Sequence, residues 1–118
     1  MKIDRQKVYE KYDGLCAYCG QRISIKNMQV DHMIPKSAVY YQLSKNPNAN
    51  LVIDSFENLM PSCRRCNHYK RADDLEGFRK KMKTIHERIA SEYIVKVAQD
   101  YGIIKILPFN GKFLFERY

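Results

Sequence analysis

The chain has 118 residues, with 21 Lys and Arg against 13 Asp and Glu and a formal net charge of +8. This length suits one modest domain and is too short for two ordinary ones, and the positive charge favours a polyanionic partner such as nucleic acid. No apolar run approaches the roughly 18 to 20 residues of a membrane span, and the N-terminus lacks the apolar core of a signal peptide, so we expect an intracellular protein without a membrane partner.

The N-terminal segment has the signals of a short helix. Asp4 precedes "RQKVYEKYD" and is a residue type that caps helices. The Asp13-Gly14 pair favours a turn and should end the helix. We therefore expect a helix within residues 5–13.

The next segment, "ISIKNMQVDHMIP", predicts two short strands around a turn at Lys26-Asn27, with Pro35 ending the second strand. Asp31 and His32 would lie late in that second strand. Neighbouring strand residues point to opposite faces, so these two side chains are expected to have different roles.

Cysteine spacing is the most informative local pattern. The four cysteines form two Cys-x-x-Cys pairs, Cys16 with Cys19 and Cys63 with Cys66. Two such pairs suit a tetrahedral Zn²⁺, because each pair offers two thiolates to the same ion. Two disulfides or reduced core thiols are the alternatives, and disulfides fit an intracellular chain poorly. Four protein ligands would leave no open position, so the zinc is expected to be structural.

A long connection, residues 36–57, follows the predicted strands, with Pro47 near its middle. Ser37 is expected to cap one or two helical turns within it. Connections of this length are often functional or mobile, so both a substrate-facing flap and a plain insertion stay open.

The C-terminal half predicts helices and then a hairpin. An apolar stripe at helical spacing predicts one amphipathic helix whose stripe packs into the core; it consists of Leu75, Phe78, Met82, Ile85 and Ile89. A second helix is expected after Ser91, ending at Gly102. Asn110-Gly111 predicts a terminal β-hairpin. The fold class is therefore α+β.

Polar residues from three segments are expected to converge beside the zinc site. They are Asp31 and His32 from the strands, Asn58 from the segment before the second cysteine pair, and Asn67, His68 and Lys70 from the first turn of a helix after it. Oxygen-rich sites suit Mg²⁺ or Mn²⁺. Such a site could hydrolyse a phosphodiester: the metal would neutralise the phosphate while His32 removed a proton from the attacking water.

Four separated motifs together resemble the HNH endonucleases: "CAYC", "VDHMIPKS", "ENL" and "CRRCNHYK". The resemblance implies a ββα-metal core stapled by a four-cysteine zinc site, with an N-terminal helix, C-terminal helices and a terminal β-hairpin. It covers about residues 14–70, and "DDLEGFR" with the terminal segment also resembles stand-alone proteins of bacteria and phages. We accordingly expect one domain over residues 1–118, with a motif core at about 14–72, an extension at about 73–118, and a location in the cytoplasm of a bacterium or a phage-infected host.

The resemblance also implies roles for individual residues. His32 matches the general base and Asp31 the adjacent metal-binding carboxylate. Asn58 matches the asparagine that orders the loop and orients the catalytic histidine. The residue after the last cysteine is often histidine in the family and is here Asn67, which is expected to be the second metal ligand, with His68 as the alternative.

Three basic residues near the second cysteine pair, Arg64, Arg65 and Lys70, are candidates for contacting DNA phosphates, although basic residues are also common at exposed helix starts. The predicted function is that of a DNA endonuclease with structural Zn²⁺ and catalytic Mg²⁺ or Mn²⁺. The resemblance to the HNH endonucleases implies products with 5′-phosphate and 3′-hydroxyl ends. One centre cuts one strand at a time, so double-strand cleavage would need a homodimer or two encounters. The alternatives are a non-catalytic zinc-stabilised nucleic-acid-binding module and a zinc-stapled protein-interaction domain.

Overall fold

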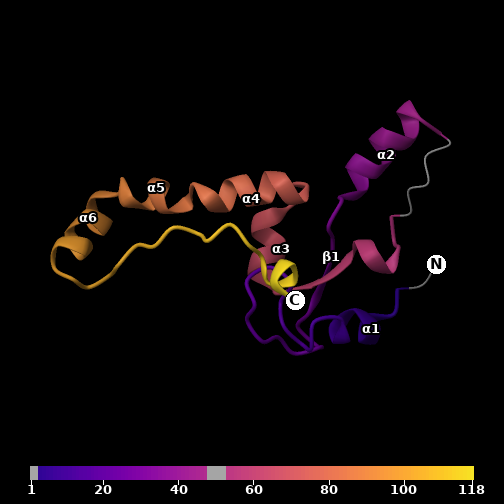
Figure 1. The fold of residues 1–118 in the computed structure, drawn as a ribbon, viewed down its shortest axis with the longest axis horizontal. Coiled ribbons are helices and arrows are strands. Elements are labelled where there is room, and N and C mark those ends of the chain that lie inside the picture. The colour runs from indigo at the N-terminus through magenta and orange to yellow at the C-terminus, as the bar shows by residue number, and fades with distance from the viewer. Residues whose placement is uncertain (1–2, 48–52) are drawn as a thin grey trace. The chain divides into compact units, whose positions relative to one another are not determined.

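The computed structural model describes residues 3–47 and 53–118, which divide into two compact units. The first unit contains the described residues up to Leu75 together with Phe113–Tyr118, and the second is Glu76–Lys112. Figure 1 shows the elements in chain order. The expectation of a single functional domain stays a prediction. No helix within the described ranges is long and apolar enough to cross a membrane.

Helix α1, Arg5–Glu10, begins where the sequence predicts it. The side chain of Asp4 accepts a hydrogen bond from the Lys7 N–H at 3.2 Å, which confirms the predicted cap. Gly14 has a φ of +79°, and a Cβ there would lie 2.8 Å from the Tyr9 hydroxyl oxygen. Only glycine fits this turn, which leads the chain from α1 into the first cysteine pair.

The sheet corrects the predicted strand pairing. Strand β1, Gln29–His32, pairs antiparallel with β2, Leu59–Ser62, and the two form a two-stranded sheet. The segment before Lys26-Asn27 is not β1's partner, because the N–H groups of Asn27 and Met28 both donate to the Ser24 carbonyl and curl the chain into a tight turn.

Strand β2 was not predicted from the sequence because Pro61 lies inside it. Proline lacks the N–H that a central strand needs, but each strand of a two-stranded sheet has an open edge where that loss is tolerated. Pro61 faces Val30 in the register, and its carbonyl accepts a hydrogen bond from Ala17 N–H at 2.8 Å.

Helix α3, Arg64–Lys70, follows β2 directly. Its N-cap is Cys63, whose Sγ accepts a hydrogen bond from the Cys66 N–H at 3.3 Å. The predicted helix after the second cysteine pair is therefore present, and β1, β2 and α3 give the strand, strand, helix order expected of the core. The predicted polar residues from Asn67 onward lie in the later part of α3, not in its first turn, because the helix already begins at Arg64.

The long connection contains more helix than expected. Helix α2, Lys36–Lys45, has Pro35 as its N-cap, with a φ of −67° that suits a helix start. Ser37 is therefore inside the helix and is not its cap. The residues of the connection at 48–52 lie outside the described part of the chain, and it ends in the short 3₁₀ helix η1, Phe56–Asn58.

In the second unit, the single helix expected from the apolar stripe is divided into α4, Leu75–Lys83, and α5, Ile85–Ala90. The break falls at Thr84, whose hydroxyl donates to the carbonyls of Lys80 and Lys81 and competes with regular helix bonding.

The core packing expected of the stripe holds only in part: Phe78 is buried, whereas Ile89 is exposed. The next helix, α6, Tyr93–Asp100, ends as predicted before Gly102, which has a φ of +71°.

The predicted terminal hairpin is wrong. Asn110 and Gly111 do form a turn, in which Asn110 Oδ1 accepts from the Lys112 N–H, but residues 103–118 contain no strand. The backbone N–H groups of Leu114 and Phe115 donate instead to the carbonyls of Tyr18 and Ala17, at 3.1 and 2.9 Å. The chain then ends in a 3₁₀ helix, η2, Leu114–Arg117. Its C-terminal segment thus braces the first cysteine pair.

The core of the first unit lies where the first cysteine pair meets the sheet and the C-terminal segment. The ring of Tyr18 packs edge-on against the rings of Phe113 and Phe115, with centroids 5.5 and 6.2 Å away. Met60 of β2 is also buried. This core fixes the first cysteine pair against the strands that carry the candidate site.

Candidate active site

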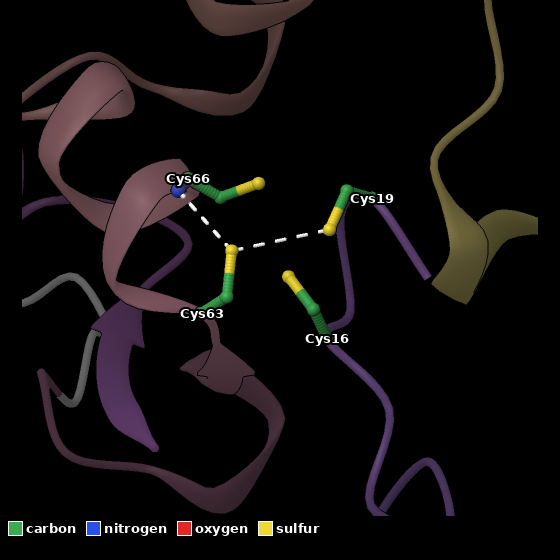
Figure 2. Close-up of side chains that lie close together, drawn as sticks. All are labelled: Cys16, Cys19, Cys63 and Cys66. Atoms are coloured by element: carbon green, nitrogen blue, oxygen red, sulfur yellow. Dashed lines mark hydrogen bonds between the residues drawn. The ribbon is translucent and has the colours of Figure 1, made fainter. Parts of the chain in front are cut away.

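The four cysteines come together although the two pairs are far apart in sequence. Their sulfur atoms all lie within 4.8 Å of one another, and the Sγ atoms of Cys19 and Cys63 are 3.9 Å apart. Figure 2 shows the four side chains converging, one pair from the loop after α1 and the other from the start of α3. All four are free thiols, which excludes the disulfide alternative in this structure.

This geometry fits a zinc ion. Four sulfurs around tetrahedral Zn²⁺ at about 2.3 Å lie about 3.8 Å from one another. Hydrogen bonds from Cys19 and Cys66 lower the pKa of Cys16, whereas hydrogen bonds to Cys16 and Cys19 raise that of Cys66. Without a metal, Cys16 therefore ionises more readily than Cys66. A bound cation would allow all four thiols to ionise.

Asp31 is held by one residue from each cysteine segment. Its carboxylate is 5% exposed, and its Oδ2 accepts a hydrogen bond from the hydroxyl of Tyr18, which lies between Cys16 and Cys19. The ammonium of Lys70, at the end of α3, lies 3.1 Å from the same oxygen. Burial and the neighbouring Asp31 carboxylate raise the pKa of Tyr18, so the phenol stays a proton donor.

Lys70 also fixes the end of β1. It is fully buried, and its Nζ donates to the His32 carbonyl at 3.0 Å in addition to pairing with Asp31. This burial counts against the phosphate contact predicted for Lys70. The burial of Lys70 could not be predicted from its local sequence, because a lysine near a helix end is usually exposed.

His32 contacts a different partner from Asp31, and the different roles expected of the two residues stay a prediction. Its Nε2 lies 2.7 Å from Oδ1 of Asp54, a residue from the long connection. The hydrogen bond from His32 lowers the pKa of Asp54, so this carboxylate is ionised at neutral pH. Asp54 was not among the predicted site residues, since nothing in its local sequence separates it from an ordinary loop aspartate.

Asn58 joins the two segments that carry His32 and Asp54. Its Oδ1 accepts from the Ile34 N–H at 2.8 Å, just after β1. Its Nδ2 donates to the carbonyls of Ile34 and Ile53, at 3.1 and 2.9 Å. The Asn58 side chain is buried, and all three of its hydrogen bonds are to backbone groups, so it holds the two segments together.

A cavity of about 360 Å³ opens beside these groups. Asp31, His32 and Asn67 all line it, and Lys36 and Arg71 add positive charge to its wall. Tyr18 and Lys70 both contact Oδ2 of Asp31, which leaves Oδ1 as the oxygen that could hold a cation. The sequence pattern did not single out Lys36 or Arg71.

Residues 16–73 match the family model of HNH endonucleases. The chain contains an HNH endonuclease domain. The matched segment includes both cysteine pairs, the two strands and α3, which is the part of the chain that forms the cysteine cluster and the cavity.

Two curated proteins are similar to part of the chain. The chain is 33% identical over 66 residues to the CRISPR-associated endonuclease Cas9 of Corynebacterium diphtheriae and 36% identical over 67 residues to the Septu protein PtuB of Bacillus thuringiensis. These alignments cover 56% and 55% of the chain but only 5% and 22% of the relatives. No solved structure gives a significant match.

The buried pair between Lys70 and Asp31 should be important for the stability of the HNH domain. Replacing Lys70 with Met leaves the Asp31 carboxylate buried with only Tyr18 as a partner, and removing one member of a buried pair costs roughly 3–5 kcal/mol. We expect such a loss in the free energy of unfolding, measured by urea denaturation at fixed metal concentration. The exposed Lys26→Met is the control and should change it by less than about 0.5 kcal/mol. Equal effects of the two variants would contradict the prediction.

Proposed function

We propose that the protein is a metal-dependent DNA endonuclease that hydrolyses phosphodiester bonds. The observation that carries this proposal is that Asp31, His32 and Asn67 line one cavity within the part of the chain that matches the HNH family. A carboxylate, an imidazole and an amide in one polar cavity are the groups that bind a hard cation and accept a proton.

In this proposal, the four cysteines hold Zn²⁺ as a structural ion. Four thiolates complete a tetrahedral site and leave no position for water or substrate, so the ion would stabilise the fold and take no part in the chemistry. The mutual distances of the sulfurs support this assignment.

Mg²⁺ or Mn²⁺ would be held in the cavity by Oδ1 of Asp31 and the side-chain oxygen of Asn67. Oxygen donors suit these hard ions. When bound, the ion neutralises charge on the scissile phosphate and on the leaving oxygen. Asn67 is preferred over His68 as the second ligand because Asn67 lines the same cavity as Asp31, whereas His68 lies on an exposed part of α3.

His32 would act as the general base. It lies at the end of β1 and lines the cavity, and its backbone carbonyl is fixed by Lys70. From this position, the imidazole removes a proton from the water that attacks phosphorus, and the leaving oxygen departs on the opposite side. Asn58 supports this arrangement because its side chain is hydrogen-bonded to the backbone of Ile34, just after His32, and of Ile53, just before Asp54.

DNA is the proposed partner. Lys36 and Arg71 place positive charge on the wall of the cavity, and Arg64 and Arg65 are exposed at the start of α3, the helix that carries Asn67. Contacts of this kind bind phosphates without reading sequence. Cleavage of both strands by this single centre would require a homodimer or two encounters.

Plasmid cleavage tests the proposed activity. Purified protein with Mg²⁺ or Mn²⁺ should convert supercoiled DNA to nicked or linear forms, and His32→Ala should lower the rate by about 10²- to 10⁴-fold, the usual contribution of a general base. His86→Ala is the matched control, because it removes a histidine of the second unit, and it should cleave at the wild-type rate. If wild type and both variants bind DNA but none cuts it, the protein is a nucleic-acid-binding module and not an enzyme.

Zinc removal should unfold the first unit. Native mass spectrometry is expected to find one zinc ion per chain, and Cys63→Ser should lower both zinc occupancy and the thermal unfolding temperature, because zinc binding and folding are coupled. Arg65→Ser, at an exposed position between the same two cysteines, controls for a substitution in this segment. A metal-free wild-type protein that melts at the same temperature as the zinc form would show that the ion is not structural.

Salt dependence tests the phosphate contacts. If Arg64 and Arg65 each contact one phosphate, replacing both with Ala should make the negative slope of log K against log salt less steep by about 2, or about 1 for each lost contact. The variant Lys7→Ala with Lys105→Ala removes the same charge elsewhere and should change the slope less. An unchanged slope in the arginine variant would place the DNA on another surface.

A further inference from the structure

Asp54 and His32 form a contact that the family motifs do not include. The two side chains come from different segments, and Nε2 of His32 lies 2.7 Å from Oδ1 of Asp54. The histidine side chain is 17% exposed and the aspartate side chain 34%, so the contact is partly shielded from water. Water therefore screens this pair less than it screens a pair between two fully exposed groups.

The backbone around Asp54 is held in place by Asn58. The Asn58 side chain donates to the carbonyl of Ile53, immediately before Asp54, and the Asn58 N–H donates to the carbonyl of Ser55, immediately after it; both bonds are 2.9 Å long. The same side chain is bonded to Ile34, two residues beyond His32. One buried amide thus sets the distance between the aspartate and the histidine.

The charge of Asp54 determines which ring nitrogen carries the proton. An ionised carboxylate only accepts hydrogen bonds, so Nε2 of His32 must carry the hydrogen. In the neutral ring, the free lone pair is then on Nδ1. Lys36, at the start of α2, adds a further favourable charge near Asp54.

We propose that Asp54 is a positioning residue for His32: its carboxylate accepts the Nε2–H, fixes the orientation of the ring and leaves Nδ1 to take the proton from water. This inference rests on the proposed role of His32 as the base, and it assigns to the long connection a part in building the site. Asn58 then has a second task, because it holds the segment that carries Asp54 as well as the end of β1.

The test compares three variants of the full zinc-bound protein. Asp54→Ala removes the acceptor, Asp54→Asn keeps an acceptor oxygen of similar shape, and Asp100→Ala removes a carboxylate from an exposed position on α6. The first measurement is the ring nitrogen-15 spectrum of His32 without added Mg²⁺ or Mn²⁺. The second is plasmid nicking at saturating metal, with kcat and KM determined separately and folding checked by thermal unfolding.

If the proposal holds, wild type and Asp54→Asn show a His32 Nε2–H signal protected from exchange with water, and Asp54→Ala loses it. The kcat of Asp54→Ala falls roughly 10- to 100-fold, by analogy with the loss of a partner that orients a metal-bound histidine. The KM of Asp54→Ala stays unchanged. The kcat of Asp54→Asn falls less than that of Asp54→Ala, and Asp100→Ala has the kcat and KM of wild type.

Two results would overturn the proposal. In one, Asp54→Ala keeps the protected signal and the wild-type kcat. In the other, Asp54→Ala leaves the ring signal unchanged but raises the metal concentration needed for half-maximal rate, which would make Asp54 a metal ligand. The ring spectrum needs no cleavage. An inactive wild-type protein would therefore count against nuclease activity alone, and the spectrum would still decide whether Asp54 positions His32.

Discussion

The buried carboxylate of Asp31 is the constraint around which the first unit is organised. A charge with this little exposure is costly unless it is paired and hydrogen-bonded, and Asp31 has both kinds of partner. Tyr18 reaches it from the loop between the first two cysteines, and Lys70 reaches it from the end of the helix that starts at the second two. The cysteine cluster fixes the origin of both segments, so the partners of Asp31 arrive together.

The rest of the site depends on a second polar anchor. Asn58 is buried, and its side chain is hydrogen-bonded to backbone groups of two segments. One segment follows His32 and the other precedes Asp54. A small unit has little apolar core with which to hold loops, and specific polar bonds do this work instead. The site is thus set by two buried polar residues, the charged Asp31 within β1 and the neutral Asn58 immediately before β2.

Local signals in the sequence were sufficient for part of this architecture. The cap at Asp4 and the helix after the second cysteine pair follow from patterns within a few residues. Pairing between β1 and β2 could not be found in this way, because Pro61 disguises one strand and the partners are separated by a long connection. The prediction of a terminal hairpin was wrong because the N–H groups of Leu114 and Phe115 donate to carbonyls of the first cysteine loop and not to a partner strand. Asp54 and the burial of Lys70 depend wholly on tertiary contacts.

The position of Tyr18 between Cys16 and Cys19 limits how the domain can be redesigned. A cysteine cluster used only as a staple could be exchanged for a disulfide or for extra apolar packing, provided that the loops stayed close. Here the loop must also present a phenol to a carboxylate across the core, with its ring clamped by Phe113 and Phe115. Any replacement for the staple therefore has to reproduce the path of that loop residue by residue, and the chain's last six residues would have to be transplanted with it.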